Sequence, residues 1–284
     1  MTVTLAAERT FVRSGAATLV AFATAEAGRP PVVFLHAGVC DSRMWHHEFD
    51  ALGATRRVVA YDRRGYGETK SVHEPHVPVD DLIAVLDAFG IGRAVLVGCS
   101  NGGRIALDTA VTHPDRVAGL VLVCAAVGGA PEDPIWTTDP RLKAIYDAWL
   151  AAEAHKDEAG LARIAARVWL DGPLEAEGRV GGDVRDLFMT MMDRSLVDAE
   201  DESLSIHPQT AYAALPGLQA PTLVYWGPLD VSTVTDVMKH AAAAIPGALG
   251  FEIPGTAHLP NLERPELFMP PLEAFVEALD EPLG

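Results

Sequence analysis

The sequence predicts an α/β protein with a mostly parallel central sheet, flanking helices and a helical cap. Three observations predict this class. From residue 31 onward, short apolar runs alternate with longer segments of helical period, as in sheets joined by crossover helices. The runs are apolar throughout, as expected for strands buried on both faces. One long segment in the second half of the chain has no strand pattern at all.

The sheet and its covering helices follow in chain order. An antiparallel hairpin is expected first, at residues 10–12 and 19–24. The apolar runs then predict strands at residues 31–36, 57–61, 94–98, 117–124, 221–226 and 250–253. Helical periodicity predicts helices at residues 79–89, 103–112, 234–244 and 266–279. The second of these ends at His113-Pro114, because proline cannot continue a helix.

The segment without strands covers residues 128–217, about ninety residues, far longer than an ordinary connection. Apolar side chains recur in it at helical spacing, which predicts three amphipathic helices that cover the sheet. We therefore expect a core formed by residues 1–127 and 218–284, with residues 128–217 inserted as a cap. The three apolar faces are Leu142, Ile145, Tyr146, Trp149 and Leu150; Leu161, Ile164, Ala165, Val168 and Trp169; and Leu187, Phe188 and Met191.

Composition narrows the range of partners. The 284 residues include 22 basic and 39 acidic ones, and the formal charge of −17 would repel nucleic acids and anionic membranes. We expect a small-molecule substrate, with no nucleic-acid or membrane partner; the sequence does not indicate the oligomeric state. The start has no secretory pattern, and no apolar run approaches the roughly 20 residues that span a bilayer. Three scattered cysteines fit a reducing cytoplasm.

The strand at residues 94–98 leads directly into Gly98-Cys99-Ser100-Asn101-Gly102 and then into a helix. This G-x-S-x-G pattern lifts a serine hydroxyl out of a sheet as a nucleophile. Glycine at both flanks removes side chains that would collide where the strand turns sharply into the helix. Ser100 is therefore the candidate nucleophile.

A serine hydroxyl needs a base, and the base needs an acid that orients it. Asp230 follows the strand at 221–226, and His258 follows the strand at 250–253. The carboxyl ends of parallel strands meet at one edge of a sheet. The chain order Ser, Asp, His therefore predicts a catalytic triad.

Attack on a carbonyl also requires two N–H donors for the developing oxyanion. The residue after the nucleophile, Asn101, provides one. The loop after the strand at 31–36 provides the other, for which we favour Gly38 over Ala37 or Val39.

These motifs resemble the α/β-hydrolase superfamily, and within it the capped serine esterases, haloperoxidases and lactonases. The resemblance spans nearly the whole chain: His36 and Trp45, Asp62-Arg63-Arg64-Gly65-Tyr66-Gly67, the serine pentapeptide, His113-Pro114-Asp115-Arg116-Val117, and His258 with Glu263-Arg264-Pro265. It implies that residues 62–67 form a structural turn. Ser100 occupies the position where epoxide hydrolases and haloalkane dehalogenases of this superfamily have aspartate. Two departures are Ala37, where relatives commonly have glycine, and Cys124-Ala125-Ala126, where some relatives place the acid.

The sequence thus predicts a serine hydrolase that cleaves a carboxylic ester, thioester or lactone through an acyl-serine intermediate. No metal or organic cofactor is expected, since His46-His47 and His73-x-x-His76 lack accompanying ligands at matching spacing. Two alternatives remain: a biosynthetic acyltransferase, cyclase or lyase with the same triad, and a non-catalytic protein that binds a small ligand. An apolar substrate pocket is predicted from cap residues Trp136, Trp149, Trp169, Phe188 and Met192.

Overall fold

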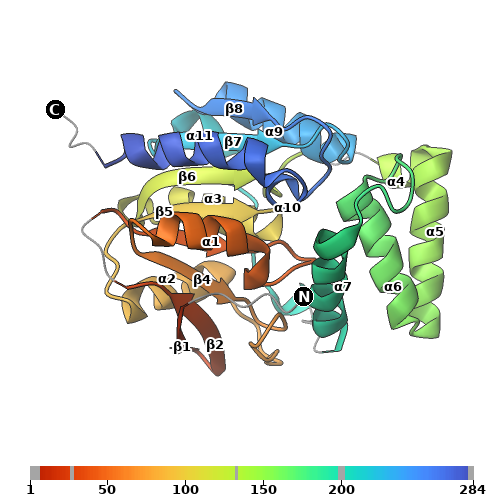
Figure 1. The fold of residues 1–284 in the computed structure, drawn as a ribbon, viewed down its shortest axis with the longest axis horizontal. Coiled ribbons are helices and arrows are strands. Elements are labelled where there is room, and N and C mark those ends of the chain that lie inside the picture. Colours follow the sequence, from red (N-terminus) through yellow and green to blue (C-terminus); the bar gives the residue numbers. More distant parts are fainter. Residues whose placement is uncertain (1–6, 26–28, 132–133, 198–201, 281–284) are drawn as a thin grey trace.

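The computed structural model describes residues 7–25, 29–131, 134–197 and 202–280. Its centre is an eight-stranded sheet in the order β1-β2-β4-β3-β5-β6-β7-β8 (Figure 1). β1 and β2 form an antiparallel hairpin, and β2 pairs antiparallel with β4; the pairs from β4 to β8 are parallel. The strands are β1 (Glu8–Ser14), β2 (Ala17–Ala23), β3 (Val32–Leu35), β4 (Val58–Asp62), β5 (Ala94–Cys99), β6 (Val117–Val123), β7 (Thr222–Trp226) and β8 (Leu249–Glu252). The predicted fold class is confirmed.

Helices cover both faces of the sheet, and each face has its own apolar core. Val32 and Phe34 of β3 face the layer of α1 (His46–Gly53) and α11 (Pro265–Ala278). Val33 and Leu35 face the opposite layer. That layer is formed by α2 (Pro78–Ala88), α3 (Asn101–Thr112) and α9 (Ser232–Ala244). Burial on both faces explains why the inner strands β3 and β5 are apolar throughout, whereas the edge strand β8 is exposed along its length.

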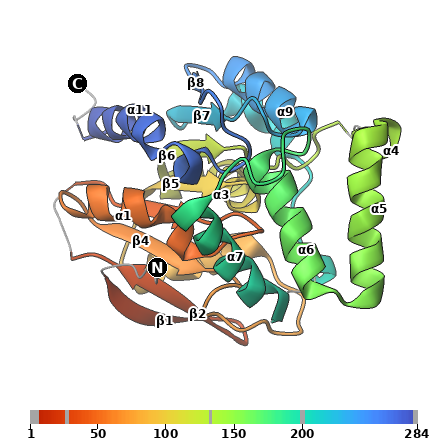
Figure 2. The same cartoon turned by 45° about the vertical axis from the view of Figure 1, so that its right-hand side comes forward.

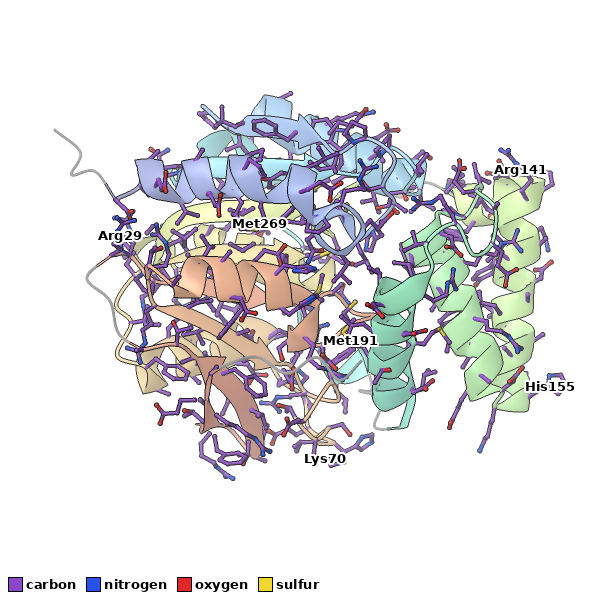
Figure 3. The ribbon with its side chains drawn as sticks, in the orientation of Figure 1. Arg29, Lys70, Arg141, His155, Met191 and Met269 are labelled. Atoms are coloured by element: carbon purple, nitrogen blue, oxygen red, sulfur yellow. The ribbon has the colours of Figure 1, made fainter. Side chains whose placement is uncertain are left out.

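The chain between β6 and β7 forms a helical layer beside the core. Its members are α4 (Ile135–Thr138), α5 (Pro140–His155), α6 (Glu158–Ala165), a π-helical turn (Ala166–Asp171) and α7 (Gly182–Val197). α5 is outermost, and α6 and α7 lie between it and the core (Figure 2). Met191 of α7 reaches the core, where its Sδ accepts the Asp41 N–H at 3.5 Å (Figure 3).

Several elements differ from the sequence prediction. Residues 46–47 lie outside the predicted strands and helices but begin α1, and the short helix α10 (Pro260–Glu263) was also not predicted. The helices α1 and α10 are both too short to establish a helical period in the sequence. The predicted helical face at 161–169 is one α-helix and then the π-helical turn.

The last part of the segment between β6 and β7 packs on the core. The short helix α8 (Ala211–Ala214) contacts α3, and Ala211 and Leu215 are buried in the core around α3. The chain therefore returns to the core before residue 218.

Within the part of the chain that the structure describes, no helix has both the length and the apolar character needed to cross a membrane. The expected lack of a secretory signal concerns the first residues, of which 1–6 lie outside the described residues.

Candidate active site

Ser100 lies between β5 and α3, and its backbone is strained. Its φ of 52° and ψ of −119° fall in a region that non-glycine residues rarely adopt, at a cost of about 1–3 kcal/mol. Glycines make this turn possible. A Cβ on Gly98 would lie 2.3 Å from the Gly102 carbonyl oxygen, and one on Gly102 would lie 2.2 Å from the Leu35 carbonyl oxygen. The turn points the Ser100 side chain away from the sheet, and Ser100 is partly exposed.

Asp230 and His258 are brought together by the loops that follow β7 and β8. The Nδ1–H of His258 donates to Oδ2 of Asp230 at 2.6 Å, and both side chains are buried. The other oxygen of Asp230 accepts the Val231 N–H at 2.8 Å, which fixes the carboxylate. Because the proton is on Nδ1, the neutral imidazole keeps an unprotonated Nε2 that can act as a base.

The cap holds His258 directly. The His258 backbone N–H donates to the Trp169 carbonyl oxygen at 3.3 Å, and the two rings pack with centroids 4.5 Å apart. Trp169 lies in the π-helical turn, where an unwound backbone presents its carbonyl to the neighbouring loop. From the core side, the Cys99 thiol approaches the His258 carbonyl oxygen at 3.7 Å.

An ion pair ties the same loop to the cap. Glu263 of α10 accepts the N–H groups of Ala257 and Leu259, and it also accepts from the Arg179 guanidinium of the cap. Arg179 further donates to the carbonyl oxygens of Leu170 and Gly255, at 2.9 and 2.7 Å. Burial raises the pKa of Glu263 to about 7, although Arg179 and the two N–H groups favour its charged form. Arg179 thus connects the π-helical turn to the segment that carries His258.

The predicted oxyanion loop adjoins the start of α3. A Cβ on Gly38 would lie 2.9 Å from Nδ2 of Asn101. The Asn101 N–H belongs to the first turn of α3, where N–H groups have no partner inside the helix. The N–H of Ala37 donates to the Met44 sulfur at 3.3 Å, so Ala37 is not available as the second donor. Gly38 and Val39 remain as candidates for the second N–H donor.

His36 fixes this loop as a neutral side chain. Its Nδ1–H donates to the Ala37 carbonyl oxygen at 2.8 Å, and its Nε2 accepts the Arg63 N–H at 3.0 Å. Burial, with a smaller contribution from the Arg63 cation, lowers the pKa of His36 well below its usual value. The imidazole therefore bridges the loop to the turn at residues 62–67.

A cavity of about 710 Å³ lies above these groups, between the sheet and the cap. Ser100 and His258 line it together with Gly38 and Asn101, while Asp230 lies behind His258. Of the predicted pocket residues, Trp149, Trp169 and Met192 line this cavity. The other lining residues are Val39, Tyr66, Cys124, Ala126, Glu153, Ser195, Leu196 and Val234.

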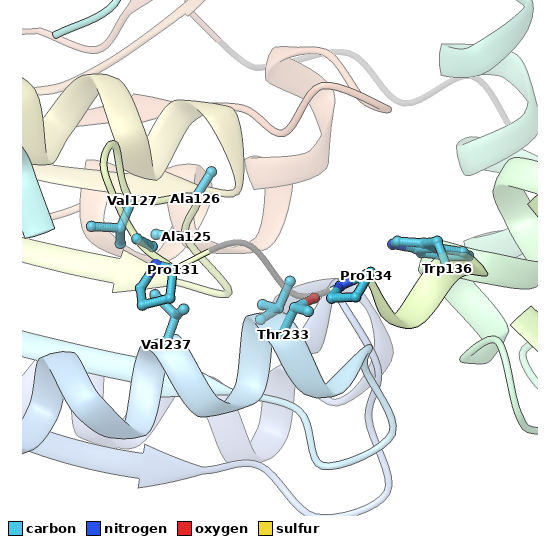
Figure 4. A pocket seen from close by; sticks show the side chains of 10 residues that line it. Ala125, Ala126, Val127, Pro131, Pro134, Trp136, Thr233 and Val237 are labelled. Carbon is cyan, nitrogen blue, oxygen red and sulfur yellow. The ribbon is translucent and has the colours of Figure 1, made fainter. Parts of the chain in front are cut away.

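Two predicted pocket residues lie elsewhere. Phe188 is fully buried in the core beneath α7, because its helical face packs on the core rather than on the cavity. Trp136 lines a neighbouring cavity of about 630 Å³ with Ala126 and Pro131 (Figure 4), and its ring packs against Trp169 at 6.3 Å. The sequence did not predict Tyr66, Glu153 and Leu196 as lining residues. Glu153 lies one turn after Trp149, and this spacing is the only signal that could have found it.

Cys124, Asp230 and His258 also place a thiol, a carboxylate and an imidazole within 4.8 Å of one another, a combination that could bind a metal ion. Burial raises the pKa of Cys124 well above its usual value, so the sulfur is a neutral thiol and a weak ligand. Its Sγ approaches the Ala257 carbonyl oxygen at 3.8 Å. The short bond between Asp230 and His258 fits a carboxylate that orients a catalytic base better than a metal site.

Known proteins resemble this chain, some of them over most of its length. A family model described as alpha/beta hydrolase fold matches residues 30–265. A 3-oxoadipate enol-lactonase from Acinetobacter baylyi is 25% identical over 88% of this chain and 90% of its own length. An epoxide hydrolase B from Mycobacterium tuberculosis is 38% identical, over 35% of this chain and 30% of its own. The structure of a thermophilic esterase from Thermogutta terrifontis superimposes with a TM-score of 0.77 at 26% identity, covering 97% of this chain and all of that one. These relatives support hydrolase activity.

Proposed function

The chain belongs to the α/β-hydrolase fold family, and on this premise we propose that it is a serine hydrolase. It cleaves a carboxylic ester, thioester or lactone of a small substrate that is apolar around the reacting carbonyl. The observation that carries the proposal is the 2.6 Å bond between His258 Nδ1 and Asp230, which leaves Nε2 as the base in a cavity that Ser100 also lines.

In the proposed mechanism, Nε2 of His258 takes the proton of the Ser100 hydroxyl as Oγ attacks the substrate carbonyl carbon. Asp230 holds the imidazole in the required tautomer and stabilises its positive charge. The imidazolium then protonates the leaving alcohol, thiol or ring oxygen, and the acyl group stays on Oγ. A water molecule, deprotonated by His258, attacks the acyl carbon and releases the acid and free Ser100.

The oxyanion is stabilised by backbone N–H groups of Asn101 and of Gly38. The short approach between Gly38 and the Asn101 side chain supports this pairing, since it brings the loop and the helix start to the same end of the cavity. Losing one such donor costs about 10²–10³ in kcat in other serine hydrolases.

The test is hydrolysis of p-nitrophenyl esters with acyl chains from acetate to decanoate, with the acid product quantified. We expect Ser100→Ala to lower kcat by about 10³-fold or more, and Asp230→Asn by about 10³–10⁴-fold. Thr112→Ala, at the far end of the helix that Ser100 begins, is the control and keeps the wild-type rate.

Two results would overturn the proposal. One is a Ser100→Ala variant that keeps a tenth or more of the wild-type rate. The other is acylated Ser100, detected by mass spectrometry, that releases no acid to water. That result would indicate acyl transfer, cyclisation or lyase chemistry with the same residues.

A further inference from the structure

The cavity that contains Ser100 has an uneven distribution of charge. Among the described residues that line it, Glu153 is the one carboxylate. None of these residues is a lysine or an arginine. The remaining wall is largely apolar or aromatic, with Trp149, Trp169 and Leu196 on the cap side. A substrate group that reaches α5 therefore meets a negative charge and indole rings.

Glu153 is held in place by its neighbour on α5. The indole N–H of Trp149, one turn earlier, donates to Oε1 of Glu153 at 2.7 Å. Trp169 continues the same wall and packs against His258. Aromatic faces beside a carboxylate favour a cationic ligand, because both the ring quadrupole and the carboxylate attract positive charge.

A buried cation lies beside another wall of the cavity. The Arg63 guanidinium stacks on the Tyr66 ring at 4.5 Å, and Arg63 is not among the lining residues. Its charge therefore does not neutralise Glu153 within the cavity. The cavity is thus negative at the cap, where Glu153 is the charged group among the described lining residues.

We propose that this polarity determines the substrate class of the serine hydrolase proposed above. The part of the substrate that extends from the reacting carbonyl to α5 is cationic or neutral, and substrates with a carboxylate there are rejected. The preference decreases in the order alkylammonium, neutral, anionic. Glu153 is the specificity-determining residue, and Trp149 orients it.

The experiment compares three p-nitrophenyl esters of similar acyl length that differ in terminal charge: 4-(trimethylammonio)butanoate, hexanoate and hemiglutarate. The rate of Ser100→Ala is subtracted from each. We expect wild-type kcat/KM for the cationic ester to exceed that for the anionic ester by about tenfold or more. Glu153→Gln should lower this ratio by about fivefold, and Glu153→Lys should invert the preference.

Glu158→Gln is the matched control. It removes the same charge from an exposed position at the start of α6, outside the cavity lining, so it changes the ratio by less than twofold. Equal kcat/KM for the three esters, or a ratio that Glu153→Lys leaves unchanged, overturns this inference while the proposed function stands. Absence of Ser100-dependent hydrolysis of all three esters overturns the proposed function instead.

Discussion

Single buried residues determine how the stability of this protein depends on pH. Glu48 of α1 is completely buried, and burial raises its pKa to about 8. The Asn261 side chain and the backbone N–H of Glu48 favour the charged form of the carboxyl group, but burial outweighs both. The folded protein therefore favours the neutral acid over a pH range in which a free glutamate is ionised.

Glu48→Gln should flatten the pH dependence of stability. Between the usual pKa of 4.5 and about 8, the folded state holds a proton on Glu48 that the unfolded state has lost. The proton on Glu48 therefore contributes fully to the wild-type free energy of unfolding below pH 4.5. As the pH rises to 8 this contribution is lost, and the free energy of unfolding falls by about 2–4 kcal/mol. Glutamine does not titrate, so the stability of the variant should rise relative to that of the wild type as the pH rises from 4.5 to 8.

Urea unfolding of both proteins at pH 5, 6.5 and 8.5 measures the difference. Asp62 and Glu263 also have pKa values raised to about 7, and they affect both proteins equally, so the difference isolates Glu48. Wild-type and variant curves that run parallel from pH 5 to 8.5 would show that Glu48 is ionised in the folded protein.

The residues of the candidate site differ in how far the sequence could predict them. Ser100, Asp230 and His258 could be placed because Ser100 directly follows a strand and the other two lie in the loops after strands, and parallel strands end at one edge of the sheet. Glu153 and Phe188 could not, because the side of a cap helix that faces the cavity depends on how α5 and α7 pack against their neighbours. Apolar periodicity identifies a buried face without saying what buries it.

At the scale of secondary structure, the junction between the cap and the core depends on two short elements. The π-helical turn supplies the Trp169 and Leu170 carbonyl oxygens, and α10 supplies Glu263. Arg179 joins them, and its partner Glu263 has a side chain that is only 1% exposed. The apolar pattern predicted residues 161–169 as one regular helix and did not predict α10, since a π turn departs from the 3.6-residue period only locally and α10 is a single turn.

Arg179→Met should loosen this junction. The substitution leaves a buried carboxylate without its charged partner, which costs about 3–5 kcal/mol of unfolding free energy when the carboxylate is ionised. The loss should be larger at pH 8 than at pH 6, because a pKa of about 7 or higher allows Glu263 to bind a proton at the lower pH. Activity should fall as well, since the Trp169 carbonyl no longer holds His258 in a fixed position.

Arg163→Met provides the comparison for this experiment. Arg163 of α6 is 66% exposed and lies 4.0 Å from Asp157, so its removal should cost less than about 1 kcal/mol. Chemical denaturation of both variants at pH 6 and 8, with ester hydrolysis assayed in parallel, distinguishes the loss of the buried ion pair from the loss of the exposed one. An Arg179→Met protein as stable and active as Arg163→Met would mean that the ion pair does not hold the junction.

At the scale of the whole molecule, the net charge of −17 acts over longer distances than Glu153 does. The summed field raises the local concentration of cations around the protein and lowers that of anions. Glu153 acts only on a substrate already in the cavity. The two effects have the same sign. Glu153 is itself exposed, but it would contact a bound substrate directly. Ionic strength separates the two effects, because salt screens charges farther apart than the Debye length more strongly than charges in contact.

Raising the salt concentration from about 20 mM to about 500 mM shortens the Debye length from roughly 20 Å to roughly 4 Å. We therefore expect kcat/KM to fall for the cationic ester, to rise for the anionic ester and to change little for the neutral one. Glu153→Gln should keep this dependence of kcat/KM on salt, since it changes the net charge of −17 by only one unit. At high salt, its preference for the cationic ester should fall below that of the wild type. If the wild type loses all cationic preference at high salt, the long-range field alone selects the substrate. A residual preference that disappears in Glu153→Gln assigns the selection to the cavity.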